Sequence, residues 1–98
     1  MYQVLFSSRC SKELTAFKKE GKITSEGLLV IKLWVQEMTL FGPEYIKNCG
    51  HWNDHALKEK RAGERSSSYS KSGRIIYKLV KNKIVIKVLK ITPDHDYK

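Results

Sequence analysis

The sequence predicts an α+β domain: an N-terminal strand and a two-helix hairpin, then a three-stranded antiparallel meander, with the helices on one face of the sheet. Residues 74–80 (RIIYKLV) and 83–91 (KIVIKVLKI) alternate β-branched or aromatic side chains with Arg and Lys, which is the period of half-buried strands. Residues 24–41 instead form a mainly apolar segment that begins with capping residues and precedes Gly-Pro, which is typical of a helix. Residues 1–98 are enough for one such domain and too few for two.

The N-terminal half is expected to hold one strand and two helices. Residues 2–7 alternate as a short strand does. Ser11 is expected to cap a first helix that ends at Gly21. Thr24 or Ser25 is expected to cap the second helix.

The second helix has more apolar side chains than one buried stripe needs, because ten of the fourteen residues from Leu28 to Phe41 are apolar. The face expected to pack on the sheet comprises Leu28, Ile31, Val35 and Met38. The apolar side chains left for another surface are Leu33, Trp34 and Phe41. Either the first helix and residues 43–57 cover this excess, or it binds a partner chain or a second copy.

A tight hairpin is predicted between the last two strands. Lys81-Asn82 fits a two-residue turn, which would place Tyr77 opposite Ile86 on the apolar face. Pairing of Tyr69 with Arg74 across the preceding turn would add the third strand to this sheet.

One face of the sheet is therefore expected to be basic. Its members would be Arg65, Tyr69, Arg74, Lys78 and Lys87. Cations beside an aromatic ring have the make-up of a site for a nucleic-acid backbone. The alternative is a solvated face whose Lys and Arg protect the sheet from edge-to-edge pairing.

The charge distribution favours an anionic partner. The net charge is +9, of which residues 50–98 contribute +7 and residues 1–49 only +2. A nucleic acid fits this basic half best, an acidic protein second, and a membrane surface least. Cys10 and Cys49 have neither a disulfide pattern nor a metal-ligand spacing, so we expect a reducing cytoplasm and no metal.

The motifs of nucleotide-binding loops, zinc hydrolases and nucleophile elbows are absent, and no cofactor is expected. Metal-free RNA cleavage needs a base for the 2′-hydroxyl, a cation for the phosphoryl oxygens and an acid for the leaving 5′-oxygen. The candidates are His51, His55, His95, Tyr97, Arg65 and Arg74. His95 is favoured, because the last strand runs antiparallel past Arg74 and Pro93 turns the chain there.

The order of elements, HxL at 55–57, GxR at 63–65, RIIYKL at 74–79 and a C-terminal His and Tyr together resemble the RelE/ParE superfamily of toxins from type II toxin-antitoxin pairs. The RelE, YoeB and YafQ branch is the most similar. The resemblance implies a RelE-like fold and a cytoplasmic, ribosome-dependent mRNA endoribonuclease, or mRNA interferase. Such a toxin cleaves mRNA in the ribosomal A site by metal-free transesterification, inhibits translation and arrests growth. Its partner would be an acidic antitoxin.

The resemblance also implies roles for individual residues. Arg74 matches the strand arginine that stabilises the transition state, and Arg65 falls where RelE has a catalytic-site lysine. Asp54-His55 resembles the Asp-His pair of YafQ, and His95 and Tyr97 resemble the C-terminal His and aromatic residue of YoeB and YafQ. The residues expected to bind the RNA backbone are Lys58, Lys60, Arg61, Tyr69, Lys78 and Lys87.

Departures from the family pattern favour a histidine-based mechanism. Ser67 stands where RelE has a second lysine, and Asp94 about where it has a late arginine. Ser68 and Ser72 stand where YafQ has a histidine and an aspartate. Two alternatives share this sequence pattern: a ParE-like inhibitor of DNA gyrase without RNA chemistry, and a basic nucleic-acid-binding module without catalysis.

Overall fold

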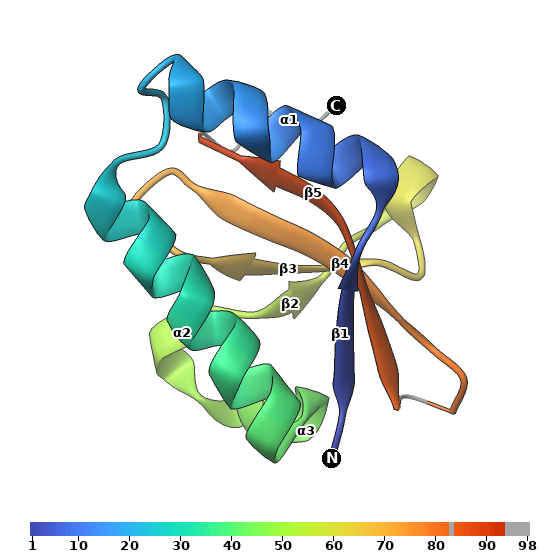
Figure 1. Cartoon of the computed structure of the whole chain (residues 1–98). Coiled ribbons are helices and arrows are strands. Elements are labelled where there is room, and N and C mark those ends of the chain that lie inside the picture. The colour runs from blue at the N-terminus through green and yellow to red at the C-terminus, as the bar shows by residue number, and fades with distance from the viewer. Residues whose placement is uncertain (83, 94–98) are drawn as a thin grey trace.

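The computed structural model describes residues 1–82 and 84–93 and has one five-stranded sheet of order β1-β5-β4-β3-β2 (Figure 1). The strands are β1 (Gln3–Phe6), β2 (His55–Ala56), β3 (Arg65–Ser68), β4 (Arg74–Val80) and β5 (Val85–Thr92). The helices are α1 (Ser8–Lys19), α2 (Ser25–Phe41) and α3 (Pro43–Asn48), with short 3-10 turns η1 (Gly50–Trp52) and η2 (Glu59–Arg61). The predicted α+β class is confirmed. β1 pairs with β5 in parallel, whereas the other neighbouring strands are antiparallel.

The first helix begins one turn earlier than expected. Ser7 is its N-cap, and the Ser7 hydroxyl oxygen accepts a hydrogen bond from the Cys10 amide at 3.1 Å. Ser11 is therefore inside α1, and the prediction that it caps the helix was wrong. Ser7 caps the helix because it follows β1 with an extended backbone, which points its side chain toward the free amides of the first helical turn.

The second helix has the predicted limits. The Thr24 hydroxyl accepts from the Gly27 amide at 2.9 Å, and Gly42 ends the helix with a φ of 87°. A side chain at Gly42 would also meet the Tyr2 ring at 2.4 Å, so this position requires glycine for two reasons. No helix in the described residues is long and apolar enough to cross a membrane.

The buried stripe of α2 differs from the predicted one. It comprises Gly27, Ile31, Trp34 and Met38. Trp34 is fully buried and packs edge-on against Tyr77 with 5.3 Å between ring centroids, so its assignment to the outer surface was wrong. Four large apolar side chains of α2 are left exposed, Leu29, Leu33, Leu40 and Phe41, and Tyr45 of α3 is exposed next to Phe41. The excess apolar surface is thus not covered by the rest of the described chain.

The β4–β5 hairpin is wider than a two-residue turn. Val80 pairs with Val85 and Tyr77 with Val88, so the predicted pairing of Tyr77 with Ile86 was wrong by two residues. A shift of two leaves each side chain on its expected face. A bulge between Ile76 and Tyr77 then moves the register by one more residue, which sets Arg74 opposite Thr92.

The register of β3 on β4 also differs, and here by one residue. Arg65 pairs with Tyr77 and Ser68 with Arg74, whereas the sequence suggested that Tyr69 pairs with Arg74. A slip of one residue exchanges the faces of a strand. Arg65 therefore lies on the face that packs on α2. Tyr69 belongs to the hydrophobic core, where its hydroxyl donates to the Thr92 carbonyl at 2.8 Å, so its predicted role as an exposed stacking ring was wrong.

Candidate functional site

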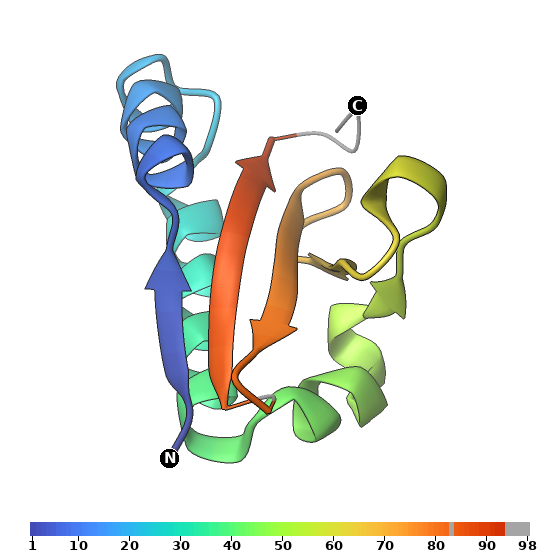
Figure 2. The same cartoon turned by 90° about the vertical axis from the view of Figure 1, so that its right-hand side faces the viewer.

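The face of the sheet turned away from α2, here called the open face, is the candidate nucleic-acid surface (Figure 2). The strand pairs place on it Ser68, Arg74 and Thr92 in one row and His55, Ser66, Ile76 and Lys90 in the next. Ser66, Ile76 and Thr92 are buried, whereas the other four side chains are half-buried or exposed. Lys78 and Lys87 face one another in a third row. Like charges directly opposite on neighbouring strands repel, so an anion bound between these two lysines would relieve that repulsion.

Arg74 begins β4 and is held against the preceding turn. Its Nη1 donates to the carbonyls of Gly73 at 2.9 Å, Lys71 at 3.3 Å and Ser70 at 3.4 Å. Among the described residues these bonds engage Nη1 alone. A guanidinium has five N–H donors, so the remaining ones are suited to a phosphate.

His55 reaches the open face by strand pairing. It lies in the short edge strand β2 opposite Ser66, and Ser66 lies opposite Ile76. The exposed His55 ring places Nδ1 3.1 Å from the Asn53 carbonyl oxygen. With Nδ1 as the donor, Nε2 is left as an acceptor for a proton. One strand, β3, lies between β2 and β4, so the backbones of β2 and β4 are about 10 Å apart.

A groove of about 330 Å³ runs over the open face beside β5. Leu89 and Lys90 line it from β5, Arg9 and Glu13 from α1, and Arg61 and Glu64 from the η2 segment. Its ion pairs join Lys90 and Arg9 to Glu13 at 3.8 and 3.7 Å, and Arg61 to Glu64 at 2.6 Å. Lys58 and Lys60 are exposed in the same η2 segment. Three cations against two acids leave this groove basic.

On the other face of the sheet, the Asp54 carboxylate is fully buried. It accepts hydrogen bonds from Arg65 Nε at 2.7 Å, Ser67 Oγ at 2.6 Å and the Tyr77 hydroxyl at 2.5 Å. Three donors satisfy a buried carboxylate that would otherwise be costly. The carboxylate therefore does not hold His55, which instead contacts the Asn53 carbonyl oxygen.

The Asp54 carboxylate raises the pKa values of the two ionisable groups that donate to it, Arg65 and Tyr77. Burial, next to the negative Asp54, raises the pKa of the Tyr77 hydroxyl far above its usual range, so Tyr77 stays a donor. Burial alone would lower the pKa of Arg65, but its hydrogen bond to Asp54 and the charge of that carboxylate outweigh burial and leave the pKa raised. The cluster is a stable ion pair with two neutral donors.

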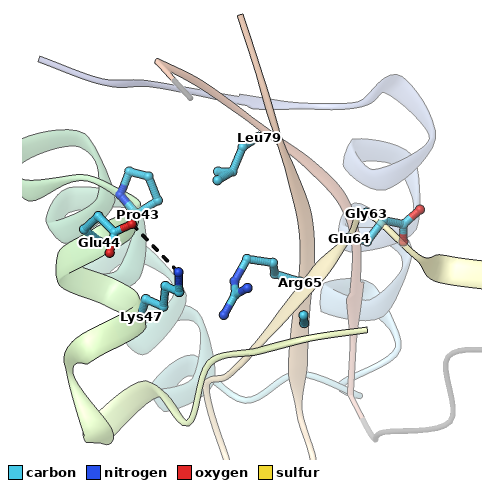
Figure 3. Close-up of a pocket in the computed structure, with 8 residues that line it drawn as sticks. Pro43, Glu44, Lys47, Gly63, Glu64, Arg65 and Leu79 are labelled. Atoms are coloured by element: carbon cyan, nitrogen blue, oxygen red, sulfur yellow. Dashed lines mark ion pairs between the residues drawn. The ribbon is translucent and has the colours of Figure 1, made fainter. Parts of the chain in front are cut away.

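A second pocket, of about 270 Å³, lies on this face between α3 and the strands β2, β3 and β4. Figure 3 shows the guanidinium of Arg65 and the ammonium of Lys47 pointing toward one another across it, with Pro43 and Leu79 on the apolar side. Lys47 is paired with Glu44 at 3.8 Å.

The predicted site residues thus separate into two groups. The open face and its groove bring together Arg74, His55, Lys78, Lys87 and Arg61, with Lys58 and Lys60 at the η2 segment. Arg65 and Tyr69 lie elsewhere, and His95 and Tyr97 lie outside the described residues. In the part of the chain that the structure describes, no group of three or more His, Cys, Asp and Glu is placed to hold a metal.

Sequence reasoning missed Arg9 and Lys90, which line the groove. Lys90 has a weak signal, since it continues the basic alternation of its strand. Arg9 has none, because its place depends on how α1 crosses β5.

No protein-family model matches the sequence, and no curated protein sequence matches it. The fold matches solved toxin structures. A chain of the YoeB-YefM complex from Staphylococcus aureus has a TM-score of 0.69 at 16% identity, covering 99% of each chain. A metal-bound toxin from Helicobacter pylori has 0.73 at 17%, covering 97% of this chain and 96% of that one. YafQ from E. coli has 0.65 at 20%, covering 93% and 91%. The predicted resemblance is confirmed for the fold.

The buried carboxylate leads to a stability prediction. Asp54→Asn should lower the free energy of unfolding by about 2–3 kcal/mol, because Arg65 loses its counter-charge. We place the loss below that of a fully buried pair, since the Arg65 side chain is 20% exposed. Urea denaturation measures it, with the surface variant Glu44→Gln, expected within about 0.5 kcal/mol of the wild type, as the control. Equal free energies of unfolding for the two variants would show that the Asp54 carboxylate does not stabilise the fold.

Proposed function

Since this chain has the fold of the YoeB and YafQ toxins, we propose that it is the toxin of a toxin-antitoxin pair and a ribosome-dependent mRNA endoribonuclease. The observation that supports this best is Arg74, which lies at the start of β4 on the same open face as His55 and the Lys78-Lys87 pair. A cation, a titratable imidazole and a basic surface are the parts that metal-free RNA cleavage needs.

The proposed reaction is a transesterification on mRNA in the ribosomal A site. The 2′-oxygen of one nucleotide loses its proton to a base and attacks the adjacent phosphorus. The bond from phosphorus to the 5′-oxygen then breaks, and an acid protonates that oxygen. The products are a 2′,3′-cyclic phosphate and a 5′-hydroxyl. Arg74 stabilises the negative charge that develops on the phosphoryl oxygens.

The acid and the base are assigned to His95 and His55. Thr92 pairs with Arg74, and His95 follows Thr92 by three residues, a span of at most about 11 Å. His55 approaches the same face from β2, with Nε2 as the proton acceptor. Tyr97 is proposed to stack on or position a base. Arg65 has no part in this proposal, because it is bound to Asp54 on the other face.

The RNA backbone is proposed to follow the open face. Lys78 and Lys87 would bind phosphates on the sheet, and Arg61 would do so along the groove. Lys58 and Lys60 extend this surface from the η2 segment. Several phosphates neutralised together make binding weaken steeply as salt is raised.

An acidic antitoxin is the proposed partner in the cytoplasm. Structures with this fold include the complexes YoeB-YefM and DinJ-YafQ. Here α2 exposes Leu29, Leu33 and Leu40 on the side opposite its buried stripe, as a straight apolar ridge. The net charge of +9 disfavours a second copy of this chain on that ridge. An acidic, amphipathic segment fits both features.

A ParE-like inhibitor of gyrase is the second candidate, since a YoeB/ParE toxin from Agrobacterium tumefaciens has the same fold. Such a function needs no arginine and histidine on one face of the sheet, so the composition of the open face favours the nuclease.

Arg74→Ala should lower the rate of mRNA cleavage about a hundredfold, the usual cost of removing one positioned donor at a developing charge. The fold should stay intact, because the Arg74 side chain bonds, among the described residues, only to carbonyls of the turn that precedes its strand. A translation reaction programmed with one mRNA measures the rate. Lys32→Ala, which removes a charge from the exposed side of α2, is the control and should cleave normally. Wild-type cleavage by a folded Arg74→Ala protein would refute the assignment.

His95→Gln should lower cleavage about a hundredfold or more, as loss of a general acid or base does. His55→Gln should have a smaller effect. His51→Gln is the matched control and should cleave at the wild-type rate, because the His51 ring packs against Trp52 in η1, away from the open face. The same assay compares the three variants. If His51→Gln were as damaging as His95→Gln, the proposed site would be wrong.

A further inference from the structure

The pocket between α3 and the sheet places two cations from separate elements at one small opening. Arg65 enters it from β3 and Lys47 from α3, and Figure 3 shows their charged ends directed at the same space. Like charges repel at short range, so the arrangement is stabilised by an anion between them.

Arg65 is held in place for such an anion. Its Nε is bound to the fully buried Asp54 at 2.7 Å, and the side chain is only 20% exposed. The terminal nitrogens of the guanidinium point into the pocket (Figure 3). A fixed guanidinium binds an oxyanion with two parallel hydrogen bonds and loses little side-chain entropy when it does so.

The acidic residues of the pocket limit what can enter. Glu64 is bound to Arg61 at 2.6 Å, whereas Glu44 is 3.8 Å from Lys47 and its side chain is 71% exposed. A carboxylate from outside can therefore replace Glu44 at Lys47. Arg65 and Lys47 are balanced by the Asp54 carboxylate and by Glu44, so a chain of phosphates would add uncompensated charge here. A single carboxylate that takes the place of Glu44 keeps the charge balanced.

The remaining wall is apolar. Pro43 lines the pocket from α3, beside Glu44, and Leu79 lines it from β4 (Figure 3). The volume of about 270 Å³ is at the small end of ligand pockets and suits one side chain rather than a nucleotide chain.

We infer that this pocket binds a single carboxylate on a short apolar stem, such as a glutamate side chain from an acidic protein segment. The pocket lies on the face opposite Arg74, and Glu64 is, among the described residues, the one that lines both this pocket and the groove on the open face. The inference goes beyond the proposed nuclease and does not need it, because the binding can be measured without activity.

The test uses the full chain and two peptides, acetyl-Leu-Glu-Leu-amide and its matched acetyl-Leu-Gln-Leu-amide. Nuclear magnetic resonance titration follows the Arg65 Nε–H and the Leu79 methyl groups. The Glu peptide should shift both signals and bind about tenfold more tightly than the Gln peptide, since it alone makes charge-assisted hydrogen bonds. Lys47→Ala should weaken the Glu peptide by about tenfold. Lys32→Ala removes the same charge from α2 and should leave the affinity unchanged.

A second variant distinguishes loss of the binding site from loss of the fold. Arg65→Lys keeps the charge beside Asp54 but lacks the planar fork, so it should weaken the Glu peptide while thermal unfolding shows a folded protein. Equal binding of the two peptides, or equal losses in Lys47→Ala and Lys32→Ala, would overturn the inference. So would a short oligouridylate that shifts Arg65 and Leu79 more than the Glu peptide does, because the pocket would then be an RNA site.

Discussion

The buried carboxylate of Asp54 is the constraint on which both faces of the sheet depend. Its three donors, Arg65, Ser67 and Tyr77, all have to lie on the α2 side of the sheet. If β3 slipped by one residue against β4, Arg65 and Ser67 would turn to the open face and leave the charge with the Tyr77 hydroxyl as the only one of its three donors. The same bonds hold residue 54 at the edge of β3, and the next residue, His55, pairs with Ser66 on the open face. The buried Asp54 carboxylate thus determines that Arg65 lies on the α2 face and His55 on the open face.

Under the proposed function, the two faces of the sheet bind different partners. Arg74, Lys78, Lys87 and the groove at Lys90 belong to the surface proposed for RNA. The exposed leucines of α2 and the pocket at Arg65 and Lys47 belong to the surface proposed for a protein partner. An acidic segment can therefore dock without first displacing RNA, and it needs to reach around an edge of the sheet to cover the groove.

The local elements were predictable because their signals are local. Period-two alternation gave β4 its limits of Arg74 and Val80, and the Thr24 hydroxyl marked the start of α2. The registers were not predictable, since they depend on a carboxylate in a segment with no regular pattern, on a bulge in the β4–β5 ladder and on left-handed turn residues at Lys81 and Asn82. Trp34 lies three residues after Ile31 and four before Met38, so the helical period allows its burial, but its partner ring, Tyr77, could be identified only from the packing of α2 on the sheet. For the candidate site, Arg74 and the two facing lysines followed from alternation, whereas Arg9 joined the groove only through the crossing of α1 over β5.

The central claim is that the open face cleaves mRNA on the ribosome by attack of the 2′-oxygen. The most direct measurement is the chemistry and position of RNA ends after the purified protein is added to a reconstituted translation reaction. The account predicts cuts within the codon in the A site, with a 2′,3′-cyclic phosphate on one product and a 5′-hydroxyl on the other, and no cuts in the same mRNA without ribosomes. Intact mRNA, together with loss of gyrase-driven supercoiling in a parallel reaction, would contradict the account and support the ParE-like alternative.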